Sequence, residues 1–142
     1  MKIETNKIPP EGLVLTEQAS SGELDLNTDN IKFKSPVAIK ALVSRITNAL
    51  TVNLELSATM SITCSRCLGE FETEYKQLLR LNYPIDKPAA TIDLNPEIRE
   101  EIILNYPLKT LCKEDCKGLC PKCGQNLNQG GCCCATTKTK TL

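Results

Sequence analysis

Nine cysteines are the side chains of this protein best suited to chemistry, and seven of them lie in the last quarter of its 142 residues. Cysteines two residues apart can turn both thiolates toward one point, as a tetrahedral thiophilic metal ion requires. The chain contains no histidine, so a transition-metal site would be built from sulfur. The commonest general base and the usual hydrolytic triads are also absent. The cysteines therefore predict metal binding.

The spacing of the cysteines divides them into two groups of four. Cys120 and Cys123, followed by Gly124, have the sequence of a zinc knuckle, in which glycine lets backbone N–H groups turn toward the sulfurs. After a gap of eight residues, Cys132 and Cys134 can supply the other two thiolates. A second site would join two distant segments of the chain through the remaining ligands, Cys64, Cys67, Cys112 and Cys116.

This partition has alternatives. Cys116 could exchange with another ligand, and Cys133 is left outside both groups. The spacing Cys116-x3-Cys120-x2-Cys123 also occurs in radical-SAM enzymes, but these need a large barrel, and an Fe–S cluster without that chemistry is a further interpretation. The cysteines have three other interpretations. They could form a disulfide framework, the 64–67 pair could have a redox role, or residues 132–134 could handle metal. A reducing compartment keeps thiols free, which favours two structural four-cysteine zinc sites.

The elements that must position these cysteines are mainly strands. Residues 50–63 alternate between apolar and polar, which predicts a long half-buried antiparallel strand. Together with residues 37–46 and a second alternating run that ends near Tyr83, it predicts a three-stranded meander whose second turn holds the 64–67 cysteine pair. Residues 12–16 predict a further strand. One face of the long strand would carry Leu50, Val52, Leu54, Leu56, Ala58, Met60 and Ile62.

One helix is expected after the meander. Asn95 would cap it and Pro96 would be its first residue, which predicts a helix near 96–105. Its apolar stripe, directed at the core, would consist of Ile98, Ile102 and Ile103. The predicted fold class is therefore α+β and β-rich: an antiparallel meander, one short helix and a C-terminal cysteine-rich segment resembling a zinc ribbon.

This fold implies a division of the chain into three parts. Residues 1–110 would form the β-rich core domain. Residues 111–134 have too few apolar side chains for a core of their own, so they would form a metal-binding ribbon docked on the first part, with metal supplying the folding energy. Residues 135–142 would be a flexible tail.

Composition excludes several classes of function. Seventeen basic and seventeen acidic residues balance, and aromatic residues make up 4% of the chain, so neither charge nor stacking attracts nucleic acid globally. The N-terminus has no signal-peptide core and the apolar runs are short, so we expect a cytoplasmic protein without membrane contact. There is no phosphate-binding glycine loop, and zinc closed by four thiolates has no open position for a substrate. We therefore expect no enzyme and no small-molecule substrate.

Several of these segments together resemble the YceD family, the large-ribosomal-RNA-subunit accumulation proteins of bacteria and plastids, and within it a cysteine-rich branch. The resemblance implies a non-enzymatic ribosome biogenesis factor that promotes accumulation or processing of 23S rRNA during large-subunit assembly, by binding RNA or the pre-ribosome. Because many members lack most of the cysteines, it also implies that the metal is structural. It rests on the strand that ends in Cys64-Ser-Arg-Cys67, on Ile92–Leu94, on Glu100–Leu104 with Pro107, and on Leu111–Asn128.

The partner implied by the resemblance is large-subunit rRNA or its precursor, with a ribosomal protein or assembly factor as a further possibility. Candidate phosphate contacts are Arg66, Lys113, Lys117 and Lys122, and the alternative for each is an ordinary solvated surface position. A second hypothesis is a protein-interaction adaptor that docks through its zinc ribbon. A third is an Fe–S, redox or metal-handling protein.

Overall fold

The structure is a computed structural model that describes residues 1–87, 89–132 and 134. The predictions for Cys133 and for a tail at 135–142 lie outside these residues. In chain order the elements are β1 (Lys2–Glu4), the 3-10 helix η1 (Thr5–Lys7), β2 (Leu13–Ala19), β3 (Ile31–Phe33), β4 (Val37–Ile46), β5 (Ala49–Thr63), β6 (Glu70–Pro84), β7 (Thr91–Asp93) and α1 (Asn95–Leu104).

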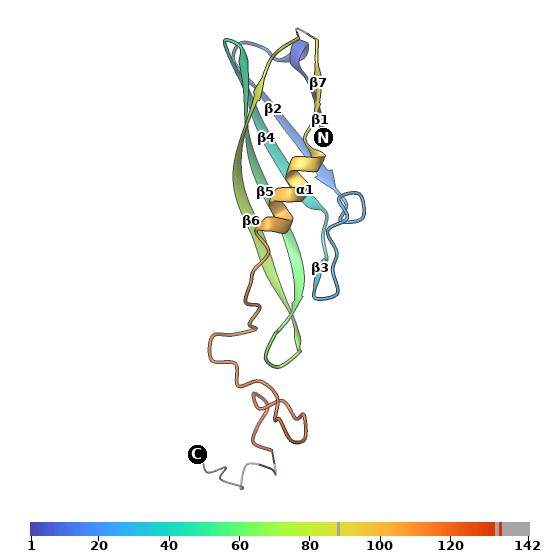
Figure 1. Cartoon of the computed structure of the whole chain (residues 1–142), viewed down its shortest axis with the longest axis vertical. Coiled ribbons are helices and arrows are strands. Elements are labelled where there is room, and N and C mark those ends of the chain that lie inside the picture. Colours follow the sequence, from blue (N-terminus) through green and yellow to red (C-terminus); the bar gives the residue numbers. More distant parts are fainter. Residues whose placement is uncertain (88, 133, 135–142) are drawn as a thin grey trace.

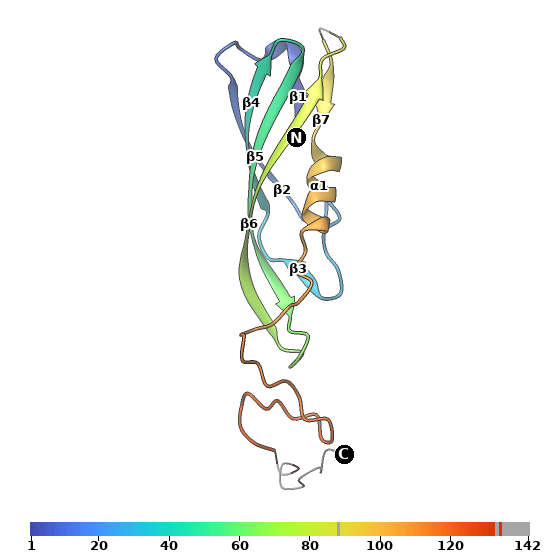
Figure 2. The same ribbon diagram turned by 60° about the vertical axis from the view of Figure 1, so that its left-hand side comes forward.

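A long hairpin of β5 and β6 forms the axis of an elongated molecule (Figures 1 and 2). Its two strands pair antiparallel without interruption, from Ala49 opposite Pro84 to Thr63 opposite Glu70. At the usual rise per residue, strands of 15 residues extend for about 50 Å. β4 pairs antiparallel with β5 on its other side, so the predicted meander and the β-rich fold class are confirmed.

β5 is the central strand of a five-stranded antiparallel sheet. One of its edges pairs with β4 and, further along, with β3, while its other edge pairs with β6. β2 lies beyond β4. The predicted apolar face of β5 is confirmed, because all seven of its side chains are buried. They share one core cluster with residues of α1 and β1, so α1 covers this face of the sheet (Figure 2).

The helix lies where the sequence places it, but two of its details differ. Ile98 and Ile102 are buried as predicted, whereas the prediction for Ile103 is wrong, because its side chain is 37% exposed. The expected capping role of Asn95 is also wrong. Asn95 is already inside α1, and its Oδ1 accepts a hydrogen bond of 2.5 Å from the Met1 amino group instead of bonding the first turn.

The contact with Met1 follows from a small second sheet that the sequence does not predict. β1 and β7 pair antiparallel, with Ile3 opposite Ile92, and this brings the start of the chain to the start of α1. Three-residue strands are too short to show a periodic pattern. Beyond α1 the chain descends to the turn between β5 and β6, where the cysteines gather (Figure 1). Within the described ranges, no helix has the length and apolar character to cross a membrane.

Candidate metal centres

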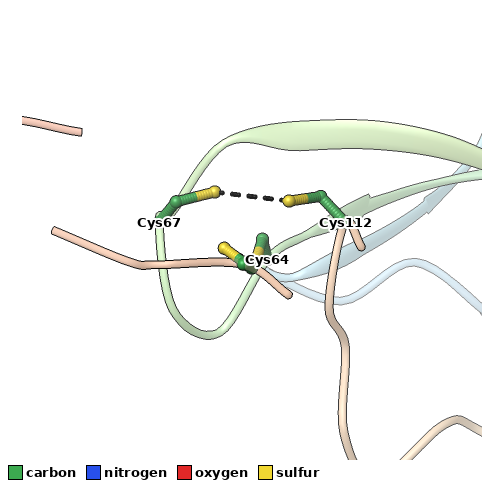
Figure 3. A group of neighbouring side chains, drawn as sticks. Cys64, Cys67 and Cys112 are labelled. Atoms are coloured by element: carbon green, nitrogen blue, oxygen red, sulfur yellow. Dashed lines mark hydrogen bonds between the residues drawn. The ribbon is translucent and has the colours of Figure 1, made fainter. Parts of the chain in front are cut away.

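The first cysteine group lies at the tip of the β5–β6 hairpin. Cys64 and Cys67 occupy the turn, and Cys112 and Cys116 come from the chain after α1. The Sγ atoms of Cys64 and Cys116 are 3.7 Å apart, as are those of Cys67 and Cys112, and all four lie within 4.8 Å of one another. Figure 3 shows Cys67 and Cys112 pointing toward each other, with Cys64 beside them. A tetrahedral zinc ion with Zn–S bonds of about 2.3 Å needs sulfurs about 3.8 Å apart, so the group fits one ion.

Hydrogen bonds from backbone and side chains hold the C-terminal segment against this hairpin tip. The Ser65 N–H donates to the Thr110 carbonyl at 2.7 Å, and the Thr110 hydroxyl donates to the Thr63 carbonyl at 2.9 Å. Arg66 Nη1 donates to the carbonyl of Cys116 at 3.1 Å. Gly118, at φ +76°, passes so close that a Cβ would lie 3.2 Å from the Arg66 carbonyl oxygen. The first cysteine group is therefore assembled by contacts as well as by its ligands.

The second group consists of Cys120, Cys123, Cys132 and Cys134, whose sulfurs also lie within 4.8 Å of one another. Both C-x2-C turns use the same hydrogen bonds. In the first, Leu68 N–H donates to the Cys64 carbonyl, and in the second, Gly124 N–H donates to the Cys120 carbonyl. This position has a positive φ of 58° at Leu68 and 74° at Gly124. Glycine adopts that conformation freely, whereas leucine is strained there.

Asn128 connects the two groups, and sequence reasoning gave it no role. It lies in the loop between Cys123 and Cys132, yet its Nδ2 donates to the Sγ of Cys116 in the first group at 3.2 Å. Its Oδ1 accepts from the Lys117 N–H at 2.9 Å. The neighbouring Leu127 N–H donates to the Gly118 carbonyl, so the loop of the second group is fastened to the first. An N–H donor on a ligand sulfur orients it and stabilises its thiolate.

Hydrogen bonding and burial shift the pKa values of the thiols in opposite directions within each group. Hydrogen bonding from the Cys67 backbone N–H lowers the pKa of Cys64 to about 6, and the Cys123 N–H does the same for Cys120. Burial raises the pKa of Cys112 to about 12, and a side-chain hydrogen bond with Cys123 raises that of Cys134 to about 12. The Asn128 hydrogen bond also lowers the pKa of Cys116, and a hydrogen bond with Cys120 raises that of Cys132, so each metal-free group contains thiols shifted in both directions. A bound cation displaces the thiol protons, so metal affinity decreases as the pH is lowered.

The geometry brings together the same two sets of four cysteines that the sequence groups, and either set could hold a metal ion. The candidate RNA contacts lie at the same end of the molecule. Lys113, Lys117 and Lys122 are exposed. Arg66 is exposed too, but its hydrogen bond to Cys116 gives it a structural contact that spacing alone does not indicate.

Comparison with known proteins places this cysteine-rich region in a family. Residues 82–141 match the family described as large ribosomal RNA subunit accumulation protein YceD. This segment of the chain is similar to the YceD family. The matched segment begins within β6, includes α1, and contains all four ligands of the second group together with two of the first. No solved structure matches the chain.

Individual proteins are similar to this chain over different lengths. The Bacillus subtilis protein YlbN is 26% identical over 136 residues, which cover 87% of this chain and 79% of that protein. "Large ribosomal RNA subunit accumulation protein YCED homolog 1, chloroplastic" is the name of two plant relatives. The Arabidopsis thaliana protein is 36% identical and the Zea mays protein 44% identical, each over 55 residues. The chain spans only 16% and 18% of their lengths, respectively.

The contact of Asn128 with Cys116 leads to a first prediction. Replacing Asn128 by alanine removes the donor to the sulfur, and we expect the first group to bind metal about 10–100-fold more weakly. Competition against a chromophoric chelator measures this affinity. The matched control is Gln125→Ala, because Gln125 has an exposed side chain and contacts Cys120 through its backbone carbonyl. Equal affinities in the two variants would contradict the role given to Asn128.

Proposed function

We propose that this chain is a non-enzymatic factor that promotes the accumulation of large-subunit ribosomal RNA, in the cytoplasm, by contacting that RNA or its precursor during subunit assembly. The observation that carries the proposal is the match of residues 82–141 to a family described by this role. The two plant relatives have the same role in their names. The matched segment also contains most of the candidate metal ligands.

The proposed metal is zinc, in two structural sites. Four sulfurs with tetrahedral spacing select zinc or an Fe–S cluster, and the 3.7 Å distances fit a single ion. Each closed site has no position for water or substrate, so zinc would stabilise the fold and supply no chemistry. Described residues 105–132 and 134 contain little regular structure beyond an isolated bridge between Leu119 and Asn126, so their order would depend on the bound ions.

The proposed RNA contacts are lysines around the metal sites. Lys113, Lys117 and Lys122 are exposed and lie on the segment that closes both sites, where they could bind backbone phosphates. Arg66 can join them with donors that it does not use on Cys116. Because Arg66 also holds the segment in place, its substitution would change folding and RNA binding together. The lysines therefore provide the cleaner test.

Charge near the metal sites favours a second candidate, a protein-interaction adaptor. Residues 105–134 contain four lysines and two acidic residues. Each zinc ion bound by four thiolates adds a net charge of about −2 to its site. Residues 135–142 add Lys138 and Lys140, so with both sites filled the charges of residues 105–142 would cancel. A segment without net positive charge does not attract RNA as a whole, so docking on a ribosomal protein or assembly factor is the function that competes with direct RNA binding.

Ultraviolet crosslinking in the protein's own cells, followed by sequencing of the attached RNA, tests the proposal. We expect reads concentrated on one region of large-subunit rRNA or its precursor. Replacing Lys113, Lys117 and Lys122 together by alanine should reduce the crosslinks. It should also reduce the salt dependence of binding, by about one unit of slope for each phosphate that a lysine no longer neutralises.

The matched control has the same number of lysines removed at the other end of the molecule, at Lys2, Lys7 and Lys87, all of which are exposed. It should crosslink like the unaltered protein. If the unaltered protein yields only background RNA but recovers a ribosomal protein or assembly factor, direct RNA binding is wrong and the adaptor function replaces it.

A further inference from the structure

β6 is an edge strand along its whole length. Figure 1 shows it at the side of the sheet beside β5. All 15 of its residues pair with β5, and among the described residues no backbone hydrogen bond joins β6 to any other segment. Its pairing contains no bulge and its interior no glycine or proline, since Pro84 is its last residue. Proteins usually shorten, kink or cover such an edge, because its free N–H and C=O groups can pair with another strand. This edge is open to a partner strand.

The side chains of β6 also suggest that a neighbouring strand is missing. Of those directed at the core, Tyr75 is buried, but four others are only partly buried, whereas the core face of β5 is fully buried: Phe71, Leu79, Leu81 and Tyr83. On the opposite face of β6, Leu78 is 80% exposed. Side chains at the edge of a sheet have no cross-strand neighbour on one side. A further strand paired with β6 would cover this apolar surface.

The charges of β6 select a second copy of β6 as that strand. Its acidic side chains precede its basic ones, in the order Glu70, Glu72, Glu74, Lys76 and Arg80. When two copies pair antiparallel about Gln77, Glu74 of each lies opposite Arg80 of the other. A register shift of two residues would place Lys76 opposite Arg80 in one direction. In the other direction it would place Lys76 opposite a second Lys76, although Glu72 would then lie opposite Arg80. Opposite charges stabilise cross-strand pairs and like charges destabilise them.

The same register gives the other residues of β6 suitable partners. All 15 residues find a partner, because Glu70 lies opposite Pro84. On the core face, Tyr75 lies opposite Leu79, which is an aromatic–apolar pair of the kind that stabilises sheets. A shift by one residue would set core-facing side chains opposite outward-facing ones. A shift of four residues would also pair opposite charges, Glu74 with Lys76 and Glu70 with Arg80, but it would leave residues 81–84 unpaired. Full overlap of the strand therefore decides for the register about Gln77, and its charges and side-chain types are compatible with it.

We propose that the protein forms a homodimer through antiparallel pairing of β6 with β6 about Gln77. The two five-stranded sheets become one continuous sheet of ten strands, related by a two-fold axis through an interface that is the same on both copies. The cysteine-bearing tips point to opposite ends and lie about 50 Å apart along the strands. The dimer would present two metal-bearing ends to its partners.

Charge reversal tests the dimer. Sedimentation equilibrium of the full-length, zinc-loaded protein should give twice the 15.6 kDa mass of the chain. Glu74→Lys or Arg80→Glu alone creates two like-charge pairs by symmetry and should weaken dimerisation about tenfold. The double variant recreates both pairs with the charges exchanged, and its dimerisation should return to near the original strength. Protection of β6 amides from hydrogen exchange should rise with protein concentration.

Two controls make the outcomes decisive. Lys40→Glu reverses a charge on β4, away from the interface, and should leave the dimer intact. Circular dichroism of each variant establishes that the sheet is folded. A protein that stays monomeric from micromolar to millimolar concentration would overturn the proposal, as would a dimer insensitive to the single reversals. A dimer restored only by exchanging the charges of Glu74 and Lys76 would overturn the register.

Discussion

Replacing Cys120 and Cys123 by serine is expected to lower the zinc content from two ions to one per chain and to unfold the segment around the second cysteine group. Structural zinc in small domains contributes an apparent binding free energy of about 10–16 kcal/mol, and this becomes folding energy when no site exists in the unfolded chain. The segment has few apolar side chains to replace it. The five-stranded sheet should persist, because its core does not include these cysteines.

Elemental analysis measures the zinc content, and limited proteolysis detects the unfolded segment. Circular dichroism should show the strand signal unchanged. Cys133→Ser is the matched control, since the sequence leaves Cys133 outside both groups, and that variant should keep two ions. Unchanged zinc content and unchanged resistance to protease in the double variant would show that metal does not hold this segment together.

The double substitution of Cys120 and Cys123 should also weaken zinc binding at the first site. Asn128 lies in the loop between the ligands of the second group, and its Nδ2 donates to Cys116. When this loop unfolds, the Cys116 sulfur no longer receives that hydrogen bond. Zinc remaining in the double variant should therefore exchange faster than zinc in the first site of the unaltered protein.

The long strands could be predicted because their pattern is both local and long. Residues 50–63 alternate throughout, and a half-buried strand in water must have this pattern. β1, β3 and β7 have three residues each, too few for periodicity, and they exist because distant segments pair with them. The capping role expected for Asn95 failed for a related reason. Tertiary pairing of β1 with β7 brings the Met1 amino group to the Asn95 side chain, and the local sequence does not predict that contact.

In the cysteine groups, too, the local features could be predicted and the contacts between distant segments could not. A C-x2-C pair is a local signal, and each of the two pairs forms a turn of the expected kind. The contacts that join these turns to other segments are not local. Arg66 bonds to a carbonyl 50 positions away, and Asn128 bonds to a sulfur 12 positions away. Both side chains are polar residues without periodic context, so the sequence could suggest only a phosphate contact or a solvated surface for Arg66.

Replacing Ile98 by alanine should be among the most destabilising single changes in the sheet domain. Ile98 of α1 is completely buried in the cluster that joins the helix to the central strands. Removing the three carbon atoms beyond Cβ leaves a cavity under a helix that is held on both sides by the chain, so the space cannot easily collapse. A change of this kind costs about 2–5 kcal/mol.

The same helix contains the matched control. Ile103→Ala makes the identical chemical change at a side chain that is 37% exposed, and we expect it to cost less than about 1 kcal/mol. Urea unfolding at saturating zinc, monitored by the strand signal in circular dichroism, measures the free energy of unfolding of each variant. The comparison holds when the two variants have the same dependence of this free energy on urea concentration. Equal losses would mean that α1 does not depend on its buried stripe. A larger loss at Ile98 would establish that the helix stabilises the sheet through that stripe, independently of the metal at the far end of the hairpin.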